Sequence, residues 1–98
     1  MNMEEMSIDM DMDKISILVI EDNRLLREGI ETLLKTQSDL LVVSSLGNGE
    51  NIIAAVMNSQ PKIVLLDLGL RDHSSLHIVK AILKKMPATK IIVMDLVA

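Results

Sequence analysis

The sequence predicts an α/β fold in which four parallel strands alternate with three helices, β-α-β-α-β-α-β, in a doubly wound sheet of strand order 2-1-3-4. Three observations indicate this fold. Short apolar runs recur about every 25 residues, stretches with helical periodicity lie between them, and polar or turn residues separate the two. Strands that alternate with helices are joined by right-handed crossovers, which makes the sheet parallel.

The four apolar runs are short and rich in β-branched residues, with polar or turn residues nearby. Such runs are typical of strands that are buried on both faces, as the strands of a helix-covered parallel sheet are. We expect strands at Ile15–Ile20, Leu40–Val43, Ile63–Leu66 and Ile91–Met94.

The first helix is predicted directly after the first strand. Its apolar residues fall at i, i+4, i+7 and i+8, which is one face of a helix. Either Asp22 or Asn23 is placed to cap its amino end. The apolar stripe consists of Leu26, Ile30, Leu33 and Leu34.

Two further helices are predicted after turn-forming residues. The second follows the turn Gly47-Asn48-Gly49, and its apolar stripe consists of Ile52, Ile53, Val56 and Met57. The third opens at Ser74 or Ser75 and closes before Pro87, because proline cannot continue a helix. Its apolar stripe consists of Leu76, Val79, Leu83 and Met86.

Composition narrows the range of functions. The 98 residues suffice for one small domain, and Phe, Tyr and Trp are absent, so no side chain offers a stacking platform for bases or flat cofactors. A net charge of −4 argues against direct nucleic-acid contact by this segment. Cysteine is absent and no run approaches the ~20 apolar residues of a membrane span, so we expect a cytoplasmic protein without membrane contact.

The chain divides into two parts. Residues 1–13 alternate Met with Asp and Glu and show neither helical nor strand periodicity. We expect a mobile acidic tail there, followed by a single domain at residues 14–98.

Acidic residues follow two of the predicted strands. Glu21 and Asp22 come directly after the first strand, and Asp67 comes directly after the third. Strands one and three are neighbours in the order 2-1-3-4, and ligands of doubly wound sheets bind beyond the carboxyl ends of such strands. Three carboxylates in one crevice would raise at least one pKa, and a hard divalent cation such as Mg²⁺ would relieve their repulsion. The alternative is that all three are polar loop residues and helix caps.

Two segments resemble motifs of response-regulator receiver domains. Ile17–Asn23, with the sequence ILVIEDN, is similar to the acidic-pair motif, and Ile63–Leu70, IVLLDLGL, is similar to the phosphoacceptor motif. Arg24–Gly29 resembles receivers that precede helix-turn-helix DNA-binding domains. The resemblance runs from about Lys14 to the last residue and implies the flavodoxin-like receiver fold.

The resemblance implies that the chain is a phosphoacceptor in a signalling reaction and not an enzyme. Asp67 would accept a phosphoryl group from the phosphohistidine of a sensor histidine kinase or from a small phosphodonor. Mg²⁺ would be held by Asp67, by Asp22 directly or Glu21 through water, and by the backbone carbonyl of Gly69. The full-length parent would regulate transcription.

Three positions depart from the family pattern. Asp95 stands where receivers usually carry Ser or Thr at the end of the fourth strand, and its carboxylate would repel a phosphoryl oxygen unless a cation or proton intervenes or the side chain turns outward. The family's Pro after the phosphoacceptor loop is Arg71, and its usual Gly is Ser75.

The 98 residues match the family only as far as the fourth strand. The fourth helix, the fifth strand with its Lys, and the fifth helix have no counterpart. The fourth strand would then be an apolar edge, and the sheet face that carries the first helix would be partly bare over strands three and four. We expect a homodimer or a strand-exchanged oligomer formed through the fourth strand.

Three functions remain open at this point. The leading hypothesis is a phosphoacceptor module of two-component signalling. The second is a pseudo-receiver, an interaction or dimerisation module that uses the fold without phosphate, which Asp95, Arg71 and the absent Lys favour. The third, a flavin- or nucleotide-binding domain of the same topology, is disfavoured because acids at both strand ends would repel a phosphate.

Overall fold

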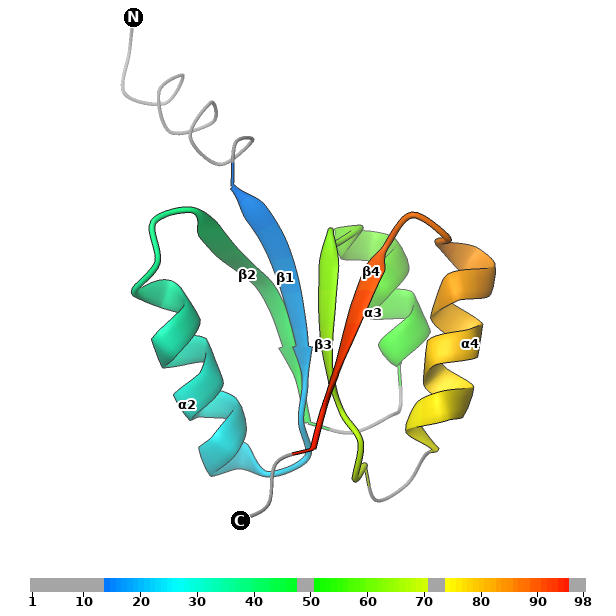
Figure 1. Cartoon of the computed structure of the whole chain (residues 1–98), viewed down its shortest axis with the longest axis horizontal. Helices are drawn as coiled ribbons and strands as arrows, with labels where there is room; N and C mark the ends of the chain where they lie inside the picture. The colour runs from blue at the N-terminus through cyan, green and yellow to red at the C-terminus, as the bar shows by residue number, and fades with distance from the viewer. Residues whose placement is uncertain (1–13, 48–50, 71–73, 96–98) are drawn as a thin grey trace, which may run out of the picture.

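The computed structural model describes residues 14–47, 51–70 and 74–95 (Figure 1). The expected tail at residues 1–13, Arg71 and most of the predicted Gly47–Gly49 turn lie outside the described residues. The elements follow in the predicted order: β1 Ile15–Ile20, α2 Arg24–Lys35, β2 Leu40–Leu46, α3 Ile52–Ser59, β3 Ile63–Asp67, α4 Ser75–Lys85 and β4 Lys90–Met94.

The four strands form one parallel sheet in the order β2-β1-β3-β4, as predicted. Helix α2 lies on one face of the sheet, and α3 and α4 lie on the other (Figure 1). The strand order reverses between β1 and β3, where Ile20 is level with Leu66. The residues that follow these two strands therefore meet at one edge of the sheet.

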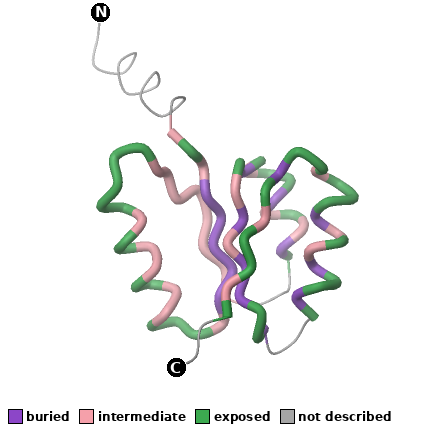
Figure 2. Tube along the Cα trace, in the orientation of Figure 1, coloured by how far each residue is buried: buried purple, intermediate pink, exposed green. Residues whose placement is uncertain are grey.

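The hydrophobic core fills the layer between the sheet and the helices α3 and α4. Figure 2 shows that buried residues concentrate in β1 and β3 and on the inward sides of these two helices. Burying each Leu, Ile or Val side chain contributes about 1.5–3 kcal/mol. The core cluster consists of Leu18, Ile20, Ile52, Val56, Val64, Leu66, Leu70, Ile78 and Ile82.

Helix α2 packs less deeply than the predicted stripe implied. The cap is Asn23, whose Oδ1 accepts a hydrogen bond from the Leu26 amide at 3.0 Å. No residue of α2 is buried, and Leu33, predicted to face the sheet, is 70% exposed. Helix α2 is the only helix that the described residues place on its face of the sheet. Its half-buried residues form a narrow row that consists of Leu26, Arg27, Ile30, Glu31 and Leu34.

The predicted apolar stripe of α4 was wrong at Leu76 and Leu83, whereas Val79 and Met86 pack against the core as predicted. Leu76 and Leu83 are exposed, while Ile78 and Ile82 are buried. The cause is Ser75, whose hydroxyl bonds to backbone carbonyls at the end of β3 and so sets the rotation of the helix. Ile78 and Ile82 lie three and seven residues after Ser75, on the same face as its side chain.

One residue of the α3 stripe also differs from the prediction. Ile52 and Val56 enter the core and Ile53 packs against it, but Met57 is 48% exposed. The helix spans only eight residues, so its buried row ends at Val56. Met57 instead faces the carboxyl-terminal end of α4, where it lines a pocket.

Strand β2 continues three residues beyond the predicted end at Val43. Ser44, Ser45 and Leu46 pair with Leu18, Val19 and Ile20 after a register shift between Ile17 and Leu18. Serine has little preference for strands, but the hydrogen bonds offered by the neighbouring β1 hold it in the ladder.

Strand β4 forms the edge of the sheet, since β3 is its sole partner among the described strands. Ile92 is 50% exposed and Val93 is 48% exposed. The predicted apolar edge is therefore present. No helix in the described part of the chain is long and apolar enough to cross a membrane.

Two alanine substitutions test which residues of α4 face the core. Ile82→Ala should lower the free energy of unfolding by about 3 kcal/mol, because it opens a cavity in the core. Leu83→Ala removes a side chain that is 41% exposed and should cost less than about 1 kcal/mol. Urea denaturation of both variants measures the difference, and equal losses would contradict the observed rotation.

Candidate functional site

Glu21 is the more deeply buried of the two buried acids of the site. It follows β1 directly and is 2% exposed. Its amide donates to the Leu46 carbonyl at 3.0 Å, which extends the β1–β2 ladder by one bond. Its Oε1 accepts from the Asn23 amide at 3.0 Å, so the turn that caps α2 also orients the carboxyl group.

Asp67 is the last residue of β3 and is 8% exposed. Its Oδ1 accepts from the Gly69 amide at 3.1 Å. A Cβ added to Gly69 would lie 3.8–3.9 Å from both carboxyl oxygens, so the Gly69 backbone packs directly against the carboxyl group. The carboxyl group is thus oriented by the loop that follows its own strand.

The carboxyl groups of Glu21 and Asp67 lie against each other. The pKa of Glu21 is raised above its ordinary value, first by burial, then by the charge of Asp67 and contact with its carboxyl group, and least by the charge of Asp22. The hydrogen bond from the Asn23 amide acts in the opposite direction. The predicted rise of one pKa is therefore present, although burial rather than repulsion is its largest cause.

The buried oxygen Glu21 Oε2 has no hydrogen-bond donor among the described residues. A buried carboxylate oxygen without a donor is costly, and a hard cation is one group that would satisfy it. Asp22 is half-buried at the margin of the pair. No three acidic, histidine or cysteine residues in the described ranges are arranged to hold a metal ion. The structure thus brings the carboxyl groups of Glu21 and Asp67 together, but Asp22 does not join them in a three-residue metal-binding arrangement.

Asp95, which the sequence resemblance predicts at a Ser/Thr position, follows β4 directly and is exposed. The Leu68 amide donates to the Met94 carbonyl at 2.7 Å, so the chain after β3 stays in contact with the end of β4. Asp95 therefore stands at the same edge of the sheet as Asp67, on the outer strand.

Sequence reasoning missed the part that Ser75 plays. Its hydroxyl is buried and lies 2.6 Å from the Asp67 carbonyl and 2.9 Å from the Leu68 carbonyl. Ser74 is the helix cap, since its Oγ accepts from the His77 amide at 3.4 Å. Two consecutive serines at a helix start gave no signal for which one would cap the helix and which one would tie it to the end of β3.

Arg27 is a second residue that sequence reasoning left out of the site. Its Nη1 donates to the Glu21 carbonyl at 2.9 Å. A Cβ on Gly47 would come within 2.5 Å of Nη1, so the absence of a side chain at this position leaves room for the guanidinium group. The only sequence signal was a basic residue next to the apolar row of α2.

Comparisons with known proteins identify the family of this chain. Residues 17–96 match the family model of the response regulator receiver domain. The transcriptional regulatory protein YxjL of Bacillus subtilis, itself uncharacterized, is 32% identical over 85 residues, which cover 87% of this chain and 39% of that protein. The response regulator VraR of Staphylococcus aureus is 31% identical over 80 residues, covering 82% of this chain and 38% of VraR.

A solved structure shows the same fold. The signal receiver domain of the NarL response regulator of Mycobacterium tuberculosis superposes with a TM-score of 0.78 at 20% identity, covering 85% of this chain and 67% of that one. The chain belongs to the response regulator receiver family. It spans less than two fifths of the length of the curated relatives it matches.

The raised pKa of Glu21 predicts a dependence of stability on pH. The folded chain holds the Glu21 proton more tightly than the unfolded chain, so this contribution to stability is complete below the unfolded-state pKa and is lost as pH rises through the folded-state pKa. We expect Glu21→Gln to remove this loss in solutions without divalent cations. Urea denaturation across the acidic pH range measures it.

The control is Glu28→Gln, which changes an exposed acid on α2 and should keep the pH dependence of the parent chain. If the stability of the parent chain and that of Glu21→Gln change equally with pH across the acidic range, the raised pKa of Glu21 is contradicted.

Proposed function

We propose that the chain is a phosphoacceptor module of two-component signalling, in which a carboxylate oxygen of Asp67 attacks the phosphorus of a kinase phosphohistidine. A new P–O bond forms, the P–N bond breaks, and the imidazole leaves with the electron pair. The observation that carries the proposal is the buried Glu21 carboxyl group held against Asp67 at the carboxyl ends of two adjacent strands.

Several contacts suit Asp67 to act as the nucleophile. A carboxylate needs no general base, because it carries no proton when ionised. The Gly69 amide on Oδ1 fixes the carboxyl group, and the Ser75 hydroxyl holds the Asp67 backbone. Fixed orientation is the main contribution that a protein makes to phosphoryl transfer, apart from electrostatics.

A divalent cation fits the donor chemistry of the site. Asp67, Asp22 or Glu21, and the Gly69 carbonyl would hold Mg²⁺, and the orphaned Glu21 Oε2 supports such a role. When bound, the cation would offset the negative charge of the carboxylates and of the incoming phosphoryl group. The cation would also lower the pKa of Glu21, which burial and the neighbouring Asp67 raise in the cation-free chain.

The relatives support a role in gene regulation for the longer protein. YxjL is described as a transcriptional regulatory protein and VraR as a response regulator. We infer that the parent of this domain regulates transcription and receives its phosphoryl group from a sensor histidine kinase. DNA contact would then belong to another domain, since the segment itself carries a net charge of −4.

A second candidate is a pseudo-receiver that acts through protein contacts without phosphate. Two observations favour it. Asp95 places a carboxylate at the end of β4, where it would repel a phosphoryl group on Asp67. The acids of the described residues also lack a finished three-ligand metal arrangement.

Intact mass separates the two candidates. After incubation with Mg²⁺ and acetyl phosphate, the parent chain should gain one phosphoryl group and Asp67→Asn should gain none. The control Asp39→Asn changes an exposed acid that precedes β2, and should be modified like the parent chain. A parent chain that is folded by circular dichroism and stays unmodified would contradict the phosphoacceptor and favour the pseudo-receiver.

We further propose that the chain self-associates through the β4 edge, where Ile92 and Val93 are half-exposed. Light scattering should show a mass above that of the monomer at micromolar concentration. Ile92→Lys should lower this mass by placing a charge on the edge, whereas Leu25→Lys, on exposed α2, should not. A monomeric mass of the parent chain across the micromolar range would contradict the proposal.

A further inference from the structure

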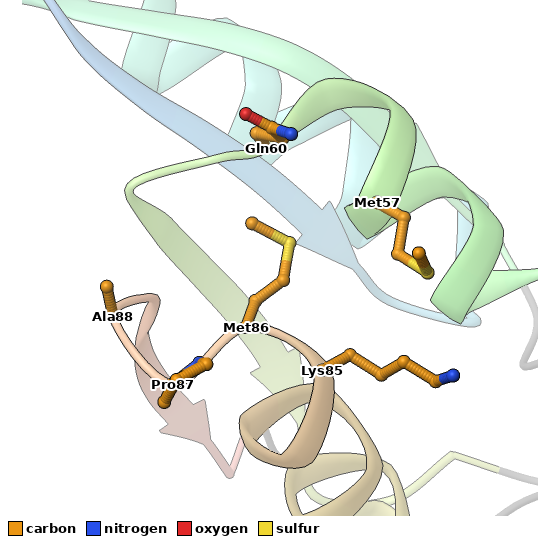
Figure 3. A pocket seen from close by; sticks show the side chains of 6 residues that line it. All are labelled: Met57, Gln60, Lys85, Met86, Pro87 and Ala88. Carbon is orange, nitrogen blue, oxygen red and sulfur yellow. The ribbon is translucent and has the colours of Figure 1, made fainter.

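A pocket lies at the edge of the sheet opposite to the acidic site. It is formed where α3 and α4 end and the chain turns into β3 and β4 (Figure 3). Its volume of about 320 Å³ is at the lower end of the range of ligand pockets. We call it the α3–α4 pocket, and its lining consists of Met57, Gln60, Lys85, Met86, Pro87 and Ala88.

The lining of the α3–α4 pocket is mostly apolar with one cationic group. Figure 3 shows Met86 projecting from the end of α4 toward α3, with Met57 and Lys85 on the same side of the opening. Methionine side chains are flexible and polarizable, and they adapt to irregular apolar partners. Lys85 is exposed, and no ion pair joins it to another described residue. The pocket therefore suits a flexible apolar segment that carries negative charge.

Basic residues extend from the pocket along the same edge of the sheet. Lys62 and Lys90 stand at the starts of β3 and β4 and are exposed. The Lys90 amide donates to the Lys62 carbonyl at 3.0 Å, so the two residues are neighbours. The Lys62 ammonium lies 3.5 Å from the Lys14 carbonyl, at the point where the chain enters the domain. Asp39, an acid of this edge, precedes β2 and so lies beyond β1 from the pocket.

Residues 1–13 have the chemistry that this edge would recognise. They contain five acidic residues, five methionines and no lysine or arginine. They join the domain at Lys14, within reach of the Lys62 ammonium. Strands β1, β3 and β4 are consecutive in the sheet, so β4 starts about 10 Å from β1. Thirteen extended residues span up to about 40 Å, which is ample for reaching the pocket.

We propose that residues 1–13 bind in cis to the α3–α4 pocket and its basic rim. Methionines of the segment pack against Met57 and Met86, and its carboxylates pair with Lys85, Lys62 and Lys90. The acidic site lies at the other edge of the sheet, so this contact neither uses nor blocks Asp67. An acidic, methionine-rich surface of a partner protein would compete for the same pocket.

A spin label tests the contact in the full chain. Cysteine is absent from the sequence, so Ser7→Cys introduces a single attachment point for a nitroxide. The nitroxide should broaden the methyl signals of Met57 and Met86 to less than half their intensity in the reduced sample. The methyl signals of Leu25 and Leu33 on α2 should keep their intensity.

Two charge reversals provide the matched comparison. Lys85→Glu should restore most of the lost Met57 and Met86 intensity, because it places a carboxylate in the pocket. Lys35→Glu, an exposed lysine at the end of α2, should leave the broadening unchanged. About 1 M salt, at which the Debye length is about 3 Å, should weaken the broadening.

Three results would overturn the proposal. The first is equal broadening of the α2 and pocket methyl signals. The second is broadening that Lys85→Glu and Lys35→Glu affect alike. The third is broadening that appears only between a spin-labelled chain and a separate isotope-labelled chain, which would assign the contact to a second copy.

Discussion

The burial of the Glu21 carboxyl group against Asp67 is the constraint on which the site depends. A buried acid beside another acid is unfavourable, and within the described residues the hydrogen-bond donors to these carboxyl groups are backbone amides rather than basic side chains. The Asn23 amide holds Glu21 and the Gly69 amide holds Asp67. The remaining oxygen, Glu21 Oε2, is left without a donor in the described structure. The cost of this unpaired oxygen favours the binding of either a proton or a cation at the site.

The fold supplies this constraint through its strand order. Because the order reverses between β1 and β3, the residues after Ile20 and Leu66 are adjacent. Two helices are attached directly to the acids: α2 begins with the turn that orients Glu21, and α4 is tied to the Asp67 carbonyl through Ser75. The Ser75 hydroxyl therefore links the amino end of α4 to the backbone that carries the Asp67 carboxyl group.

The strand order, the order of elements and the proximity of Glu21 and Asp67 were predictable from the sequence. Strand positions follow from β-branched apolar runs, and acids directly after two neighbouring strands meet at one edge. The rotation of α4 was not predictable, because it depends on the Ser75 hydroxyl rather than on apolar periodicity. The exposure of Leu33 also escaped prediction, because it reflects the lack of a neighbouring helix beside α2 among the described residues.

The position of Asp22 marks the limit of the sequence argument at the site itself. Chain order places Asp22 beside Glu21, but consecutive residues after a strand point in different directions, and side-chain placement depends on local hydrogen bonds. Of the three carboxyl groups predicted to converge, the structure brings those of Glu21 and Asp67 together. Asp22 acts on Glu21 through its charge.

A Mg²⁺ titration followed by backbone NMR tests the central claim most directly. The Asn23 and Gly69 amides report on the two carboxyl groups, because each donates to one of them. Our account predicts saturable shifts of both amides, absent in Asp67→Asn, and no shift of the Thr89 amide at the opposite edge of the sheet. The account would be contradicted if the Asn23 and Gly69 amide signals of a folded chain did not shift, or if the Thr89 amide signal shifted equally.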